Sequence, residues 1–525
     1  MRVAALDLGT NSFHLLIADA HADGHLDPIV REKEMLRLGE VVSRHGLIPP
    51  TAADQVVATV RRFRLLADAA GADEILACAT SAIRRATNGG DVVDRIEDET
   101  GVRVDVISGH EEARLIFGAV RASVVLDPPP ALCFDLGGGS LEITVGDASA
   151  MQWATSLPLG VARLTAEFVH SDPISKRDRR ELRDHIEAVL EPCRAPVAQR
   201  SPRMAVGSSG TIESLAQMVI ARLGDEMPST LNQVSITRDE LLELHQEILA
   251  SNAADRLRFD GLDARRVDLV VAGSTVLTTA MEQFDLDTIT ISEWALREGI
   301  VLDAVSRHHG SDVSDDPRAI RRDSVEGLAR RCGWAEHHAR AVAALAMELF
   351  DAIAPIVPID KLAGGDSLGP VDRELLEHAA LLHDIGEHVS STGHHRHGAY
   401  LVRNGQLRGF TPEEIEMLAA LVRWHRRGEP RVTDEFPLLD VAAMARVRAL
   451  DALLRVADGL DRSREGNVAG IEVTVNPSLV LVRPRTALAH DAELEVWGAR
   501  RKRELLEKVL DREVELPSFI PGSDQ

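Results

Sequence analysis

Two short stretches of the sequence each place an aspartate before a glycine-rich turn. Asp7 begins Asp-Leu-Gly-Thr-Asn-Ser, and Asp135 begins Asp-Leu-Gly-Gly-Gly-Ser. Successive backbone N–H groups in such a turn form a concave site for phosphate oxygens, and a neighbouring carboxylate suits a hard cation such as Mg²⁺. The two turns therefore predict a magnesium and phosphate site. Its predicted phosphate-binding residues are Gly9, Thr10, Asn11, Ser12, Gly137, Gly138, Gly139 and Ser140.

Two adjacent glutamates follow Ser108 at the start of a predicted helix. Ser108 and Glu111 have the spacing of a capping box, in which the Glu side chain bonds back to the N-cap N–H. Adjacent helix positions point about 100° apart, so Glu112 cannot share that role. A carboxylate beside phosphate and metal is suited to take a proton from an attacking water. We therefore predict Glu112 as a general base.

A third glycine loop follows the short apolar stretch that begins at Met204. A strand, a glycine loop and a helix in succession present backbone N–H groups and a positive helix end to phosphate. Thr211 fits either a phosphate contact or a plain helix N-cap. The loop adds further predicted phosphate-binding residues, namely Gly207, Ser208, Ser209, Gly210 and Thr211.

The repeated turns imply the elements that must position them. Each turn is followed by alternating apolar residues, Phe13-Leu15-Ile17 in one copy and Leu141-Ile143-Val145 in the other. This period of two after a glycine-rich turn indicates a β-hairpin. The repetition predicts two similar domains whose hairpins face each other across a cleft. Another apolar strand, predicted at 75–79, leads to Arg84 and Arg85, whose side-chain type suits phosphoryl oxygens.

The C-terminal third carries a different set of possible ligands. His338 lies on a helix predicted at 336–353, and His383-Asp384 ends the next helical stretch. An adjacent His-Asp pair with an upstream His and a downstream Asp resembles the HD phosphohydrolase superfamily, and these ligands suit Mn²⁺, Fe²⁺ or Zn²⁺. His394, His395, His397 and His425 could add a second metal, or the region could be a scaffold without metal. The predicted metal residues are His338, His383, Asp384, His425 and Asp458.

The N-terminal motifs together resemble the exopolyphosphatase/guanosine pentaphosphate phosphohydrolase (Ppx/GppA) family. The matching stretches are DLGTNSFHLLIAD, ATSAIRRATN, ISGHEEARLIF, FDLGGGSLEI, GSSGTIESLA and SEWALREGIVLD, over roughly residues 1–305. The resemblance implies an α/β fold of duplicated actin/sugar-kinase/Hsp70-like (ribonuclease H-like) domains, followed by an all-α HD-like domain and a small α+β tail. It also implies Mg²⁺-dependent release of the terminal phosphate of polyphosphate or pppGpp.

The resemblance assigns roles to individual residues. It implies that Glu112 is the catalytic base, that Arg84 binds phosphate, and that Asp135 and Glu142 belong to the second phosphate and metal loop. His14 replaces Glu142 in the first copy, so the second hairpin is the better metal site. The predicted metal ligands are Asp135, Glu142 and Asp7. Longer family members carry a helical domain thought to extend the substrate channel and to help them dimerise, so we expect a homodimer.

Composition sets limits on partners. The 525 residues carry a formal charge of −24, which repels nucleic acid and anionic membranes, so we expect neither as a partner. Four scattered cysteines without a signal peptide predict a reducing cytoplasm, and no apolar run is long enough to span a bilayer. The predicted domains are residues 1–125, 126–306, 307–465 and 466–525, with a polar linker at 307–318.

The expected tail is a β-hairpin and a further strand leading into a basic helix. Its cluster at Arg500–Arg503 could be a solvated face or a polyphosphate track. The expected activity is an exopolyphosphatase, and the sequence leaves open whether pppGpp is also a substrate. Three alternatives stay open: an ATP-dependent kinase of the same superfold, a (p)ppGpp-binding regulator with little turnover, and a metal-dependent nucleotidase acting through the HD-like residues.

Overall fold

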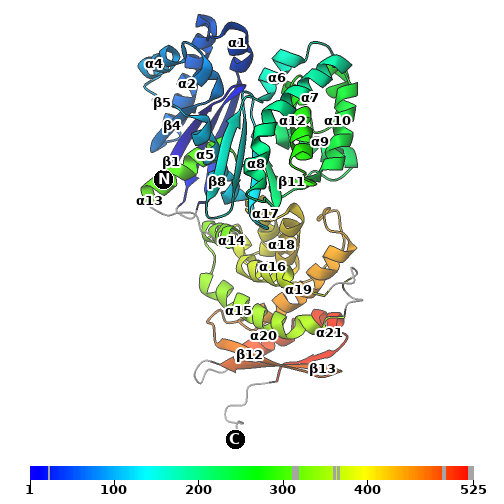
Figure 1. Ribbon diagram of the computed structural model, residues 1–525. Coiled ribbons are helices and arrows are strands. Elements are labelled where there is room, and N and C mark those ends of the chain that lie inside the picture. Colours follow the sequence, from blue (N-terminus) through cyan, green and yellow to red (C-terminus); the bar gives the residue numbers. More distant parts are fainter. Residues whose placement is uncertain (22–23, 310–318, 359–361, 363–366, 487–491, 518–525) are drawn as a thin grey trace. The chain divides into compact units, whose positions relative to one another are not determined.

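The first predicted hairpin forms the centre of a five-stranded mixed sheet. The computed structural model describes residues 1–21, 24–309, 319–358, 362, 367–486 and 492–517 (Figure 1). In the sheet order β3-β2-β1-β4-β5, β1 pairs antiparallel with β2 and parallel with β4. The strands are β1 (Arg2–Leu8), β2 (Ser12–Ala20), β3 (Leu26–Met35), β4 (Glu74–Ala79) and β5 (Val104–Val106).

The second predicted hairpin repeats this arrangement. The order of the second sheet is β10-β11-β9-β6-β7-β8, in which β6 pairs antiparallel with β7 and parallel with β9. The shared order confirms the predicted duplication of actin/sugar-kinase/Hsp70-like domains. The strands are β6 (Ala131–Leu136), β7 (Leu141–Gly146), β8 (Met151–Leu157), β9 (Met204–Ser208), β10 (Ser235–Thr237) and β11 (Thr288–Ile291).

Helices cover both sheets, because the central strands are buried on both of their faces. Ala4 and Leu6 of β1 belong to one apolar core, and Val3 and Ala5 belong to another core that also contains residues of β6, α5 and α13. The helices are α1 (Leu38–His45), α2 (Pro50–Ala69), α3 (Ser81–Arg85), α4 (Gly89–Thr100), α5 (Gly109–Ser123), α6 (Val161–Phe168), α7 (Lys176–Leu190), α8 (Arg194–Ala198), α9 (Gly210–Leu223), α10 (Arg238–Ala250), α11 (Ala253–Arg256), α12 (Val270–Gln283) and α13 (Leu296–His309).

The residues from Ala319 to Gly459 are mainly helical, as predicted. The helix expected at 336–353 is α15, and the helix that leads to His383 is α16. Their buried faces share one apolar core, which includes Val342, Leu376 and Leu450. The helices are α14 (Ala319–Arg331), α15 (Glu336–Ile353), α16 (Pro370–Leu382), α17 (His394–Asn404), α18 (Pro412–Trp424) and α19 (Val441–Gly459).

The tail forms the predicted hairpin, but the segment expected to follow it as a strand is a helix. β12 (Val468–Val475) pairs antiparallel with β13 (Leu479–Thr486), and β14 (Glu513–Glu515) adds parallel to β13. The segment expected to be a strand is α20 (Glu493–Arg500), which precedes α21 (Glu504–Leu510). Val496 and Ala499 of α20 join the same core as the preceding helices, and this packing favours the helix over the strand.

The chain divides into two compact units, Met1–Ile320 and Arg321–Gln525. Of the predicted linker, residues 307–309 belong to α13, and residues 310–318 lie outside the described residues. The finer division into four segments stays a prediction. All four cysteines are free. Among the described residues, every helix is too short or too polar to cross a bilayer.

Candidate active site

The two glycine turns meet. A Cβ atom built on Gly138 would lie 3.0 Å from the Asn11 Cβ atom, and one built on Gly139 would lie 2.5 Å from the Thr10 hydroxyl oxygen. Side chains at these positions would push the turns apart, because such distances are shorter than van der Waals contact. Glycine therefore allows the backbone of the second turn to lie directly against the first.

Neighbouring helices hold the carbonyl groups of both turns. Gly39 N–H at the start of α1 donates to Thr10 O at 2.8 Å, and Ala162 N–H at the start of α6 donates to Gly138 O at 3.0 Å. Within the described part of the chain, no protein group accepts from the N–H groups of Thr10, Asn11, Gly138 or Gly139. Buried N–H groups are rarely left without an acceptor. These four N–H groups are therefore suited to bind an anion.

A cleft of about 340 Å³ contains both turns and the start of the third loop. Its lining mixes buried carboxylates with cationic side chains, which suits a phosphate chain carrying a metal ion. Members of the predicted site that line it are Asp7, Gly9, Thr10, Asn11, Ser12, Glu112, Asp135, Gly137, Gly138, Gly139, Ser140, Ser209, Gly210 and Thr211.

Two aspartates end the central strands inside this cleft. Burial raises the pKa of Asp7 to about 7, against the lowering effect of Arg297. Burial also raises the pKa of Asp135 to about 6, although the Ser208 hydroxyl donates to the Asp135 carboxylate at 2.6 Å. The raised values mean that too few cations compensate these charges. Two dehydrated oxygen donors with this deficit fit a divalent cation such as Mg²⁺.

Glu142 lies directly across the hairpin from Asp135, but it is not part of the cleft lining. Its carboxylate accepts from the Ser156 hydroxyl at 2.7 Å. Burial, followed by the charges of Glu112 and Asp135, raises the pKa of Glu142 well above its usual value. Glu142 therefore adds negative charge beside Asp135, which lines the cleft.

Glu112 points into the cleft from the first turn of α5. Ser108 caps this helix by accepting from the Glu111 N–H at 3.1 Å, as predicted. The predicted return bond of the capping box is replaced, because the Glu111 carboxylate accepts from Arg114 at 2.7 and 2.9 Å. Glu111 is therefore occupied outside the cleft, which leaves Glu112 as the acidic group of α5 that faces the cleft.

Arg84 lies behind Glu112 rather than on the cleft wall. Its guanidinium donates to the Glu112 carboxylate at 3.1 Å and to the Ile107 carbonyl at 2.6 Å. Burial nevertheless raises the pKa of Glu112 to about 7, because it outweighs the attraction of Arg84. A carboxylate that titrates near neutral pH has the proton affinity that a general base needs.

The third loop is shorter than predicted. Gly207 and Ser208 belong to β9, where Ser208 pairs with Asp135, so the turn begins at Ser209. Ser209 caps α9 through its hydroxyl, which accepts from the Thr211 N–H at 3.3 Å, and its φ is 95°. Thr211 is therefore not the N-cap. Its hydroxyl faces the cleft and accepts from Arg266 at 3.3 Å.

Several cationic residues of the cleft were not predicted. Arg297 lies within 3.3 Å of His14, and Glu298 together with Asp7, Glu213 and Asp135 raises the pKa of Arg297. Arg297 stands within the stretch SEWALREGIVLD, so that motif carried a signal for it. Lys33 and Arg266 lie outside the quoted motifs and are brought to the cleft by the fold alone.

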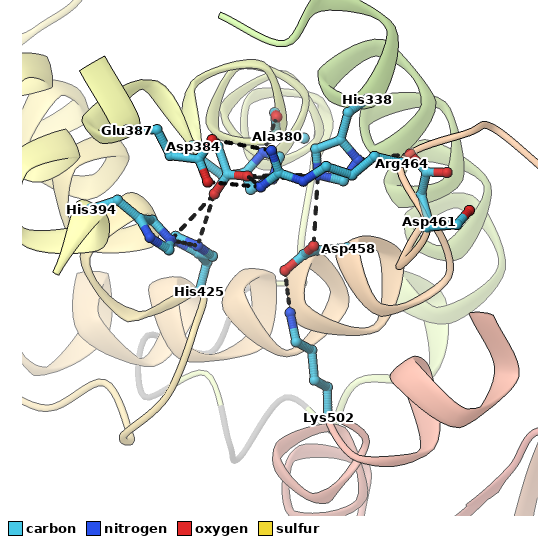
Figure 2. Close-up of polar contacts among 12 residues, drawn as sticks. His338, Ala380, Asp384, Glu387, His394, His425, Asp458, Asp461, Arg464 and Lys502 are labelled. Carbon is cyan, nitrogen blue, oxygen red and sulfur yellow. Dashed lines mark hydrogen bonds and ion pairs between the residues drawn. The ribbon is translucent and has the colours of Figure 1, made fainter. Parts of the chain in front are cut away.

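The five predicted HD-like metal residues lie together in the second unit. Their carboxylate and imidazole groups form a cluster that also includes His394 (Figure 2). Among the described residues, His395 and His397 belong to neither metal-compatible group, and their part in a second metal site stays a prediction. His395 is buried, and its ring centroid lies 5.8 Å from that of His394.

Comparison with known proteins places these observations in a family. The model of the Ppx/GppA phosphatase family matches residues 17–308, and the model of Ppx/GppA phosphatase domain III matches residues 320–490. "Exopolyphosphatase 1" of Mycobacterium tuberculosis is 38% identical over 334 residues, which cover 63% of this chain and 95% of that protein. "Guanosine-5'-triphosphate,3'-diphosphate pyrophosphatase" of Aeromonas hydrophila is 27% identical over 419 residues, which cover 80% of this chain and 79% of that protein.

Solved structures agree with the sequence relatives. An exopolyphosphatase from Cytophaga hutchinsonii superposes with a TM-score of 0.55 at 30% identity, and the match covers 60% of this chain and all of that one. The Aquifex aeolicus member of the Ppx/GppA family superposes with a TM-score of 0.52 at 28% identity, covering 59% of this chain and 99% of that one. Motifs, topology and both family models agree, and the chain belongs to the Ppx/GppA phosphatase family.

Proposed function

We propose that this chain is an exopolyphosphatase that releases the terminal orthophosphate of inorganic polyphosphate by attack of water. The observation that carries the proposal is the cleft in which the unpaired N–H groups of both glycine turns lie beside Glu112 and two buried aspartates. Such a site binds a phosphate chain end and places a base beside its terminal phosphorus. The similarity to exopolyphosphatases supports this substrate.

Asp7 and Asp135 would hold the Mg²⁺ ion, with Glu142 behind them. The ion supplies charge neutralisation at the phosphoryl oxygens when bound. The turn N–H groups and the cations Lys33, Arg266 and Arg297 bind the remaining oxygens. Glu112 takes the proton of the attacking water, and Arg84 orients the Glu112 carboxylate from behind.

The proposal includes pppGpp as a second substrate, because polyphosphate and pppGpp end in the same phosphoanhydride and a relative of this chain is named for the guanosine compound. Initial rates of phosphate release on long polyphosphate and on pppGpp, with Mg²⁺ supplied, test both substrates. We expect the higher kcat/KM on polyphosphate. Tight pppGpp binding with no phosphate release from either substrate would instead identify a regulator. Formation of ADP from added ATP, measured with and without polyphosphate, would identify an ATP-dependent kinase.

A further inference from the structure

The second unit contains a cluster of histidines and aspartates that the proposed function does not use. Its ligand atoms fall into two groups that share Asp384: one contains His338 and His383, and the other contains His394 and His425 (Figure 2). The two oxygens of Asp384 face different groups, since Oδ2 is 3.7 Å from the Nε2 atom of His338 and Oδ1 is 3.3 Å from that of His394. A carboxylate in this position can bridge two cations.

The outer nitrogens of all four imidazoles have acceptors. The Nδ1–H groups of His383, His425 and His394 donate to the carbonyls of Ala380, Val422 and Ser391 at 2.7, 2.8 and 3.1 Å. His338 donates in the same way to Asp461 at 2.7 Å. An Nδ1–H that donates outward leaves the Nε2 lone pair of a neutral ring free for a metal ion, which is how metal-binding histidines are commonly oriented.

These lone pairs face each other in two pairs. The Nε2 atoms of His338 and His383 are 3.3 Å apart, and those of His394 and His425 are 3.2 Å apart. Two acceptors at this distance repel unless a cation lies between them. A metal ion bonded to both nitrogens at about 2.05 Å would give an N–metal–N angle of about 105°, close to the tetrahedral value.

Cationic side chains now neutralise the carboxylates that a metal would bind. Arg464 donates to Asp384 at 2.5 Å, and Lys502 of the tail contacts Asp458 (Figure 2). Asp458 also lies 3.9 Å from His338, on the side of the first group. Arg464 has an alternative partner in Glu387, at 2.9 Å, so it can leave Asp384 when a metal ion arrives.

The walls around this cluster are suited to an anion. The cluster opens into a pocket of about 420 Å³, and three arginines on its wall, Arg426, Arg462 and Arg501, have no ion-pair partner among the described residues. Trp497 also lines the pocket and is 47% exposed, with the Arg501 guanidinium 4.9 Å from the centre of its ring. Unpaired arginines suit phosphoryl oxygens, and an exposed indole ring suits an organic group beside them.

We propose that the second unit holds two divalent transition-metal ions bridged by Asp384, and that this pair binds the phosphoryl group of a phosphate monoester whose organic part contacts Trp497. His338, His383 and Asp458 complete the first ion site, and His394 and His425 complete the second. Mixed imidazole and carboxylate ligands favour Mn²⁺, Fe²⁺ or Zn²⁺ over Mg²⁺. The proposal is independent of Glu112 and of the phosphate cleft.

The metal part is tested by counting Mn²⁺ ions bound to the full-length chain after removal of metal by chelation. The matched control is His388→Asn, which alters an exposed histidine four residues after Asp384. Because the function proposed above places a divalent ion in the N-terminal cleft as well, the readout is the difference from this control. We expect Asp384→Ala to bind two fewer ions and His394→Asn to bind one fewer. Electron paramagnetic resonance of the control should show two spin-coupled Mn²⁺ ions, and this signal should be lost in both variants.

Equal Mn²⁺ counts in all three variants, or uncoupled Mn²⁺ spectra in the control, would overturn the proposal. Should Asp384→Ala fail to fold, His394→Asn decides alone, because this side chain lies on the pocket wall and is partly exposed. The ligand part is tested by ³¹P relaxation of adenosine monophosphate and of inorganic phosphate with the Mn²⁺-loaded control. We expect stronger relaxation of the nucleotide phosphorus than of inorganic phosphate, and we expect this relaxation to be lost in Asp384→Ala. Equal relaxation of both compounds would contradict the proposal that the ligand is a phosphate monoester.

Discussion

Glu111 and Glu112 are neighbours in sequence with different surroundings. Arg114 holds the Glu111 carboxylate outside the cleft, whereas Glu112 lies inside it beside Arg84. We predict that Glu112→Gln lowers kcat for phosphate release by about 10²- to 10⁴-fold, the usual contribution of a general base. The measurement is the initial rate on polyphosphate, with circular dichroism to confirm the fold. Glu111→Gln is the matched control and should retain nearly full activity; equal losses in the two variants would remove Glu112 from the role.

Glu213 makes a prediction about pH. It lines the cleft on α9, and burial, followed by the charge of Glu293, raises its pKa to about 7. A carboxyl whose pKa is raised by folding stabilises the folded state at low pH, and this contribution is lost as the pH rises through the folded pKa. Glu213→Gln removes the ionisation, so the variant should gain stability relative to the wild type between pH 5 and pH 8.

We expect this gain to be about 1–2 kcal/mol, because one pKa unit corresponds to about 1.4 kcal/mol and the partial exposure of Glu213 reduces the full effect. Urea unfolding of both proteins at pH 5 and pH 8 measures it. A difference between the two proteins that does not change with pH would show that Glu213 titrates normally. Glu240→Gln, at the exposed capping box of α10, is the control substitution of the same chemical type.

At the scale of elements, Gly160 controls the position of the second turn. A Cβ atom at this residue, the N-cap of α6, would lie 2.2 Å from the Gly139 carbonyl carbon. Backbone cannot rotate away as a side chain does, so Gly160→Ala must displace the turn from Thr10. We predict a loss of about 1–3 kcal/mol in stability and a fall in kcat/KM of at least about tenfold.

The control for Gly160→Ala is Gly90→Ala on α4, where an added Cβ meets no atom within 4 Å. This substitution should leave activity unchanged and stabilise the chain by up to about 1 kcal/mol, because alanine has the higher helix propensity. Thermal unfolding and initial rates measure both variants. Wild-type activity in Gly160→Ala would mean that the contact between the two turns is not needed for catalysis.

Elements were predictable from the sequence where local pattern and tertiary packing agree. The repeated Asp-Leu-Gly turns predicted the duplicated hairpins, and the capping residue Ser108 predicted the start of α5. Local pattern failed in the tail, where a further strand was expected after the hairpin but Val496 packs as part of a helix. Packing partners distant in sequence decide such cases.

The cleft was predictable to a similar degree. Glycine and carboxylate positions leave local signatures, since they set turn geometry and charge. Lys33 and Arg266 do not, because nothing in their own segments shows that β3 and the loop before α12 end beside the glycine turns. The position of Arg84 behind Glu112 is a similar case, because only the packing of α3 against the start of α5 shows which group it contacts.

At the scale of the whole molecule, net charge and local charge oppose each other. The chain carries a formal charge of −24, whereas the cleft presents Lys33, Arg266 and Arg297 to a polyanionic substrate. Long-range repulsion acts over the Debye length, which falls from about 30 Å at 0.01 M salt to about 10 Å at 0.1 M. Contacts inside the cleft are screened much less.

We therefore predict that kcat/KM for long-chain polyphosphate rises as monovalent salt is raised from about 0.01 to 0.1 M, because screening of the net repulsion speeds association. Initial rates at a fixed free Mg²⁺ concentration measure the effect. Tripolyphosphate is the matched substrate, since it carries fewer charges outside the cleft and should depend less on salt. A steady fall in kcat/KM for both substrates over this range would show that the cationic residues of the cleft, rather than the net charge, govern the approach of the substrate.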